Sequence, residues 1–173
     1  MDIKETIATI NQMQADGVIG VYAIGGAVGA TFYLEPAATE DVDIFCALEP
    51  PPGQSILRLT PYDYLTARGY RINKEGYIVI AGWPVQFHPV GGDPLLKEAL
   101  EQSVQNDFER MPVRVFTPEH LAAVAFKLGR VKDKIRLAQL LEAHAVDESR
   151  LSSVLARHDL LDGWMQFKKQ LSG

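Results

Sequence analysis

Cysteine is almost absent from this chain, which has 173 residues and the single thiol of Cys46. That count excludes a disulfide framework and a cysteine-based zinc site. Long hydrophobic runs are also absent, since no uninterrupted apolar stretch reaches the roughly 18 residues that a membrane-spanning helix needs. The first residues include Asp2 and Glu5, where a secretory leader would be basic. We therefore expect a cytoplasmic protein with no membrane partner.

The chain lacks an excess of positive charge, because 17 Lys and Arg residues against 22 Asp and Glu residues give a formal charge of −5. A surface with this balance does not attract a long polyanion. The charges are unevenly distributed: residues 1–117 carry 8 basic and 15 acidic residues, and residues 118–173 carry 9 and 7. The first part could hold a cation and the second part a phosphate group. The alternative is that both are solvated surface.

The composition, with 47% hydrophobic and 23% charged residues, is that of an ordinary globular domain. A chain of this length buries roughly two-thirds of its extended surface on folding, which is enough for a core without disulfides. The sequence has no internal repeat, low-complexity segment or long linker. We expect one compact unit, with an α/β core in residues 1–117 and a helical region in residues 118–173 packed on it.

Hydrophobic periodicity and turn residues predict the elements of this unit. The predicted strands are 18–24, 42–48, 70–73, 77–81, 84–90 and 113–116. The predicted helices of the core are 3–14, 27–34, 60–69 and 93–106, and everything after Pro118 is predicted helical, with the last two helices at 148–157 and 160–171. A Pro-Pro-Pro-Gly run at 50–53 predicts a loop. Three helix starts share one signal, a capping residue followed by proline: Thr60, Asp93 and Thr117.

A glycine pair, Gly25-Gly26, stands between the predicted strand 18–24 and the predicted helix 27–34. Glycine lets the backbone approach a ligand closely, and the amides at the start of a helix favour an anion such as phosphate. The same pair is also typical of an ordinary turn between a strand and a helix. Alone, it leaves both interpretations open.

Two carboxylates, Asp41 and Asp43, stand two positions apart at the predicted strand 42–48. Residues two apart on a strand point to the same face, so the two side chains would lie next to each other. Neighbouring carboxylates repel each other, and Mg²⁺ would neutralise them, because it prefers carboxylate oxygens together with nucleotide phosphates. The alternative is that Asp41 caps the preceding loop.

Taken together, the strand, the Gly-Gly turn, the short helix and the Asp-x-Asp strand resemble the nucleotidyltransferase-fold superfamily. The segments GGA at 25–27 and TEDVD at 39–43 are most similar to the minimal and abortive-infection (AbiEii) type, which occurs in bacterial toxin-antitoxin and phage-defence systems. The resemblance implies a nucleotidyltransferase-like mixed β-sheet flanked by helices, with a helical C-terminal region. It also implies that Gly25 and Gly26 hold phosphate and that Asp41 and Asp43 coordinate Mg²⁺.

A second similarity to this type lies in the segments TPEHL at 117–121 and KLGRVKD at 127–133. Between positions 127 and 136, one acid, Asp133, stands among five basic residues: Lys127, Arg130, Lys132, Lys134 and Arg136. The resemblance implies that Lys127 and Arg130 bind the triphosphate. A helix that continues past Gly129 would place Lys127, Arg130 and Lys134 on one face. The alternatives are a solvated basic face and a helix break at Gly129.

The chain departs from the resemblance at one place, since members of the superfamily usually carry a third carboxylate on a later strand. The predicted strand 84–90 offers Gln86 and His88 on one face instead, and neither is an acid. A third carboxylate would help to bind the metal and could accept the proton of the acceptor hydroxyl. Glu40 and Asp133 are other possible sources of the missing charge.

The resemblance therefore implies a Mg²⁺-dependent enzyme that transfers NMP from a nucleoside triphosphate to a hydroxyl of RNA, protein or a small molecule. In this reading, Asp41 and Asp43 are the catalytic metal ligands. The alternative is a catalytically degenerate member of the same fold that binds a nucleotide or a partner protein. The sequence does not name the base, the acceptor or the oligomeric state.

The remaining reactive side chains are predicted to be structural or to lie on the surface. Cys46 follows an apolar stretch, and a small buried thiol is more common there than a nucleophile. His120, His144 and His158 have no second histidine four residues away, the partner that a helical metal site of the His-x-x-x-His kind needs.

Overall fold

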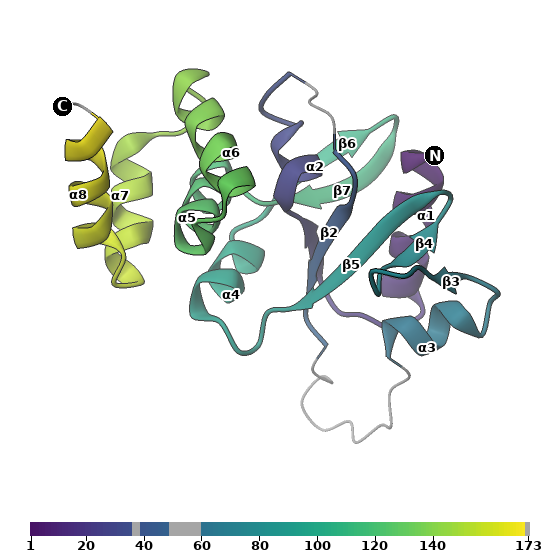
Figure 1. Ribbon diagram of the computed structural model, residues 1–173. Coiled ribbons are helices and arrows are strands. Elements are labelled where there is room, and N and C mark those ends of the chain that lie inside the picture. Colours follow the sequence, from purple (N-terminus) through teal and green to yellow (C-terminus); the bar gives the residue numbers. More distant parts are fainter. Residues whose placement is uncertain (36–38, 49–59, 172–173) are drawn as a thin grey trace.

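A computed structural model describes residues 1–35, 39–48 and 60–171 (Figure 1). Within these ranges eight helices occur: α1 Ile3–Ala15, α2 Gly26–Ala30, α3 Pro61–Thr66, α4 Pro94–Glu101, α5 Pro118–Leu128, α6 Val131–Glu142, α7 Glu148–Arg157 and α8 Leu161–Leu171. The same ranges hold seven strands: β1 Tyr22–Ile24, β2 Val42–Cys46, β3 Arg71–Ile72, β4 Ile78–Ile80, β5 Trp83–Pro89, β6 Val104–Phe108 and β7 Met111–Val115. The predicted loop at 50–53 lies outside the described residues.

The strands form a single mixed sheet in the order β3-β4-β5-β2-β1-β7-β6. Two neighbouring pairs are parallel, β2 with β5 and β1 with β7, and the other pairs are antiparallel. In the β2–β5 pair, Asp43 lies opposite Gln86 and Phe45 lies opposite His88. The register therefore places the predicted site residues of both strands on the same face of the sheet.

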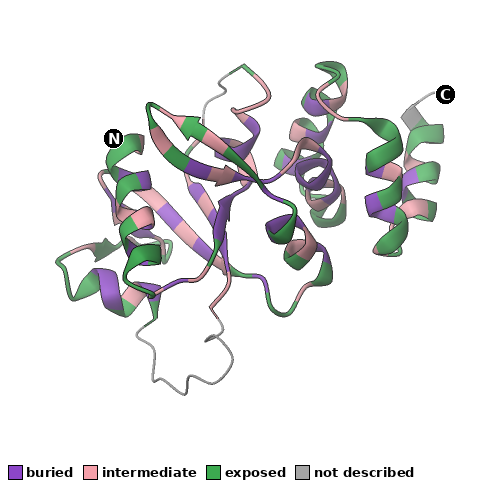
Figure 2. Ribbon diagram, turned by 180° about the vertical axis from the view of Figure 1, so that it is seen from behind, coloured by how far each residue is buried: buried purple, intermediate pink, exposed green. Residues whose placement is uncertain are grey.

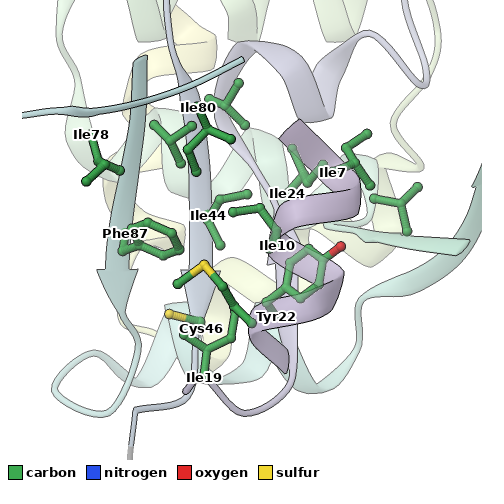
Figure 3. Close-up of a cluster of buried hydrophobic side chains, with 14 of the residues drawn as sticks. Ile7, Ile10, Ile19, Tyr22, Ile24, Ile44, Cys46, Ile78, Ile80 and Phe87 are labelled. Carbon is green, nitrogen blue, oxygen red and sulfur yellow. The ribbon is translucent and has the colours of Figure 1, made fainter. Parts of the chain in front are cut away.

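Alternation along β2 and β5 separates an aliphatic face from a polar one. Val42, Ile44 and Cys46 point to the face that α1 covers, where they are at most 1% exposed. Figure 3 shows Ile7 and Ile10 of α1 packed against this face of the sheet. A strand with one face on the hydrophobic core and the other on a polar surface requires such an alternation of apolar and polar residues.

The opposite face of the sheet packs against α4 and α5, and α6 to α8 extend from there (Figure 1). A second core lies here, built around Phe45, Phe116 and Leu121. Figure 2 shows that the outer sides of α7 and α8 are exposed, while the central strands and the inward helix faces are largely buried. In the part of the chain that the structure describes, no helix is long and apolar enough to cross a membrane.

The three capping signals in the sequence are confirmed. Thr60 forms a capping box with Asp63, Asp93 accepts hydrogen bonds from two backbone amides of α4, and Thr117 accepts one from His120. In each case the following proline occupies the first turn, where it has no hydrogen bond to lose.

Some predicted boundaries are wrong. The strand predicted at 18–24 begins only at Tyr22, and the helix predicted at 27–34 ends at Ala30 and continues as a turn. The helix predicted to reach residue 106 ends at Glu101, and residues 104–108 form the edge strand β6 instead. This strand pairs with β7 through a turn at Glu109 and Arg110, both with positive φ, where no glycine marked the hairpin.

The C-terminal helices confirm a break at Gly129. Gly129 has φ +63 and ends α5 in the left-handed conformation, and α6 starts anew after Arg130. Lys127, Arg130 and Lys134 therefore do not share the face of one continuous helix. The conformational freedom of glycine makes this sharp turn possible.

Candidate functional site

The two predicted acids meet at the start of β2. Asp41 immediately precedes the strand and Asp43 is its second residue, and both line a cavity of about 200 Å³. The cavity lies between the polar face of the sheet and helices α4, α5 and α6. Both residues therefore border the same space, with Asp43 on the strand and Asp41 just before it.

One carboxylate oxygen of Asp43 has a hydrogen-bond partner, and the other lies against Gly26. Nε2 of His88 lies 2.8 Å from its Oδ1. Its Oδ2 packs against Gly26, where an added Cβ atom would come within 2.0 Å of it. Burial alone raises the pKa of Asp43, but the hydrogen bond with His88 and nearby positive charges outweigh burial and bring the pKa below its ordinary value. The carboxylate is therefore ionised at neutral pH.

The ring of His88 is fixed by aromatic packing. It stacks on Phe45 with ring centroids 4.7 Å apart and an angle of 19° between the planes. Phe45 in turn packs against Phe116 at a centroid distance of 4.7 Å. Because this stack sets the plane of the imidazole, the direction of its hydrogen bond to Asp43 is set as well.

Two neutral or basic side chains occupy the place where a third carboxylate was sought. Gln86 lies directly across from Asp43 on β5, and His88 is the residue that contacts the Asp43 carboxylate. Both line the cavity, together with Tyr77, which immediately precedes β4. Asp133 also lines the cavity, but its carboxylate is engaged by arginine.

Packing explains why each position of the Gly25-Gly26 pair is a glycine. A Cβ atom on Gly25 would lie 2.4 Å from the ring of Phe45. Gly26 has φ +58, a conformation that side chains disfavour, and it leaves the space that the Asp43 carboxylate fills. The Gly25 amide donates to the Asp43 backbone carbonyl at 3.1 Å. Of the two, Gly26 borders the cavity.

The opposite wall of the cavity is basic and organised by Asp133. This residue is fully buried at 0% exposure, and its carboxylate accepts hydrogen bonds from Arg130 at 2.6 Å and from Arg136 at 3.5 Å. The hydrogen bond to Asp133 raises the pKa of Arg130, and the charges of Asp43 and Asp41 add to this effect. The acidic and basic walls are thus close enough to interact across the cavity.

Lys127 lines the cavity but is engaged with a protein carboxylate. Its Nζ lies 2.7 Å from Oδ2 of Asp93, whose other oxygen caps α4. Burial raises the pKa of Asp93, whereas the hydrogen bond with Lys127 contributes to an overall lowering. A phosphate that binds Lys127 would therefore compete with Asp93.

Sequence reasoning missed Arg136 and Lys132 as cavity residues, whereas Lys134 of the same basic run does not line the cavity. The available signal was the spacing of Arg130, Asp133 and Arg136, since residues three apart on a helix are neighbours. Lys132 and Arg136 both contribute to the lowered pKa of Asp43.

The other reactive side chains serve the core or the surface. Cys46 is buried, as predicted, and burial raises its pKa to about 12. Glu98 of α4 accepts hydrogen bonds from Arg157, His158 and His120, and the bond from Arg157 is the main reason that its pKa falls to about 2. This cluster ties α4, α5 and α7 together outside the cavity.

The donor set at Asp41 and Asp43 fits one magnesium ion. It offers carboxylate oxygens, the ligands that Mg²⁺ prefers, with the amide oxygen of Gln86 nearby on the same face. Across the described ranges, no three side chains of His, Cys, Asp or Glu gather closely enough to hold a metal by themselves. A cation bound here would take its remaining ligands from phosphate oxygens or water.

The comparisons with known proteins support the fold. No protein-family model matches the chain, and no curated protein matches it by sequence. A solved structure that resembles it is an antigenic nucleotidyltransferase-like protein from Paracoccidioides brasiliensis, with 14% sequence identity and a TM-score of 0.57. The match covers 97% of this chain and 89% of that chain. The chain therefore has a nucleotidyltransferase-like fold, as the sequence predicted.

Proposed function

We propose that this protein is a Mg²⁺-dependent nucleotidyltransferase that transfers NMP from a nucleoside triphosphate to a hydroxyl acceptor. One observation carries the proposal: on a nucleotidyltransferase-like fold, Asp41 and the ionised Asp43 face Arg130 and Arg136 across a single cavity. A site with a carboxylate pair on one wall and guanidinium groups on the other suits a metal-bound triphosphate.

The side chains have distinct roles in this proposal. Asp41 and Asp43 hold the ion, which when bound polarises the phosphate under attack and neutralises its charge. Arg130 and Arg136 neutralise charge on the departing pyrophosphate. Lys127 releases its hydrogen bond to Asp93 and binds a phosphate oxygen instead. Gly26, with Gly25 behind it, lets the triphosphate approach the backbone closely.

For the acceptor, the proposal relies on the resemblance of the sequence motifs to the abortive-infection type. We propose an RNA end or a protein hydroxyl as acceptor, and a role in a bacterial toxin-antitoxin or phage-defence system. A long nucleic-acid footprint is disfavoured by the net charge of −5, whereas the basic wall around Arg130 and Lys132 suffices for one RNA end.

The test is transfer of label from nucleoside triphosphates labelled at the α-phosphate into RNA or protein, with γ-labelled substrate as the control for phosphoryl transfer. Wild type should incorporate α-label only when Mg²⁺ is present. The variant Asp41→Asn/Asp43→Asn should lose incorporation, while Asp162→Asn, an exposed position on α8, should retain it. Equal incorporation by the double variant would refute the assigned roles.

A second candidate is a nucleotide-binding protein without transfer activity. The observation that favours it is that β5 presents Gln86 and His88, and no acid, beside Asp43, and that His88 already engages Asp43. Such a protein would bind nucleotide but transfer no α-label to any acceptor. Binding that does not respond to Mg²⁺ would favour this candidate over the enzyme.

A further inference from the structure

Every carboxylate around the cavity except Asp41 is already engaged by a basic side chain. Asp43 is bonded to His88, Asp93 to Lys127, and Asp133 to two arginines. The acids that line the cavity number four, and they face four permanently charged bases: Lys127, Arg130, Lys132 and Arg136. The cavity wall therefore lacks the surplus of negative charge that two neighbouring divalent cations would need.

The carboxylate of Asp43 is oriented by its neighbours. His88, held flat on Phe45, contacts Oδ1, and Oδ2 occupies the space that Gly26 leaves free. Its side chain is only 20% exposed, so few other orientations are open to it. A partner that hydrogen-bonds a metal-binding side chain fixes its orientation and thereby raises its affinity for the metal.

We infer that His88 is a positioning residue that orients Asp43, and that the cavity binds a single divalent cation with each nucleotide rather than two. The inference rests on the proposed function, since it concerns the same cavity. The place of a second cation beside the phosphates is taken by fixed positive side chains, above all Arg130 and Arg136, which the buried Asp133 holds in position. Gln86, directly across from Asp43, adds no charge.

Manganese tests both the number of cations that the cavity binds and the positioning role of His88, because bound and free Mn²⁺ differ in their electron paramagnetic resonance signal. The probe is Mn²⁺ with a nucleoside triphosphate analogue that has a methylene group between the α- and β-phosphates. Wild type at saturating analogue should bind one Mn²⁺ per chain. Two bound ions per chain would overturn the inference and leave the proposed function standing. No binding of Mn²⁺ with nucleotide would overturn both.

Substitutions at His88 separate positioning from simple packing. His88→Ala should weaken Mn²⁺ binding in the ternary complex by about tenfold, the lower end of what loss of such a partner costs. His88→Gln should recover most of the affinity, because its amide retains a donor for Oδ1 of Asp43. His144→Asn, at an exposed histidine with φ +52, is the matched control and should bind like wild type. Equal affinity of the alanine variant and wild type would overturn the role of His88.

A measurement without nucleotide checks the hydrogen bond itself. Nitrogen-15 NMR of the free protein should find the proton of neutral His88 on Nε2, the atom that faces Asp43. Asp43→Ala should abolish this preference without changing the ring signals of His144. A proton on Nδ1 in the wild-type protein would contradict the positioning role directly.

Discussion

The two faces of the β2–β5 pair use the same strands for different purposes. One face places Ile44 and Val85 in the hydrophobic core that α1 covers, together with aromatic side chains such as Phe87. The other presents Asp43, Gln86 and His88 to a cavity, where Asp43 of β2 depends on a hydrogen bond with His88 of β5. Stability and chemistry are thus divided between alternate residues of one strand.

The two faces depend on sequence information at different separations along the chain. The aliphatic face needs only the period of two along a strand, and many side chains satisfy it. The polar face needs specific partners that are distant in the chain. Asp43 and His88, for example, are separated by 45 positions. Substitutions on the first face should therefore change stability, and those on the second should change binding.

The largest effect is expected on the aliphatic face. Ile44 is 1% exposed, so Ile44→Ala should lower the free energy of unfolding by about 2–5 kcal/mol, as measured by urea denaturation. Nucleotide affinity of the folded fraction should be unchanged. Ile72→Ala, at a residue that is 50% exposed, is the control and should cost well under about 1 kcal/mol. An equal loss of unfolding free energy in the two variants would contradict the stabilising role assigned to this face.

Gly26 lies where the backbone meets the polar face. Gly26→Ala would place its Cβ within 2.0 Å of Oδ2 of Asp43, so the carboxylate must move. We expect Mn²⁺ affinity with nucleotide to fall more than tenfold, the order seen when a ligand loses its support. Gly17→Ala is the control: its φ of +71 imposes a similar backbone strain of about 1 kcal/mol, but nothing lies within 4 Å of its Cβ. Unaltered Mn²⁺ binding by the Gly26 variant would show that the position of Asp43 does not matter.

Two basic residues of α6 provide a matched pair. Arg136→Gln should weaken nucleotide binding by about tenfold, which corresponds to loss of one charge-assisted hydrogen bond of roughly 1.5 kcal/mol. Lys134→Gln removes the same charge from the same helix at a residue that does not line the cavity. Calorimetry should therefore detect a difference between the two variants. If both weaken binding equally, the effect comes from net charge and not from the site.

The smallest effect concerns pH and lies outside both faces. The pKa of Glu98 falls to about 2 in the folded protein, so its bonds stabilise the fold fully above its ordinary pKa of 4.5 and are lost as the pH falls toward 2. Glu98→Gln should cost about 1 kcal/mol above pH 4.5, with the difference from wild type closing toward pH 2. Urea denaturation across this range measures it. Glu142→Gln, at an exposed residue, should show no difference, and a constant difference for Glu98→Gln at all pH values would refute the linkage.

Much of the fold could be predicted because its signals are local. The caps at Thr60, Asp93 and Thr117 and the strand at Val42–Cys46 follow from residues within a few positions. The β6–β7 hairpin could not be predicted in this way, because Glu109 and Arg110 adopt positive φ without the glycine or asparagine that usually marks such a turn.

The site was predictable only in part for the same reason. Asp41 and Asp43 are two residues apart in the sequence, and both line the cavity, although Asp41 lies just before β2. The contact of His88 with Asp43 depends on the register of β2 with β5, and the contact of Lys127 with Asp93 depends on how α5 packs on α4. No local pattern in the sequence specifies either register or packing.

The most direct test of the central claim is a calorimetric titration of the four nucleoside triphosphates into wild type and Asp41→Asn/Asp43→Asn, each with and without Mg²⁺. The account predicts that at least one triphosphate binds wild type much more tightly with Mg²⁺ than without it, and that the double variant loses this dependence. Equal binding by both proteins, or no binding of any triphosphate by wild type, would contradict it.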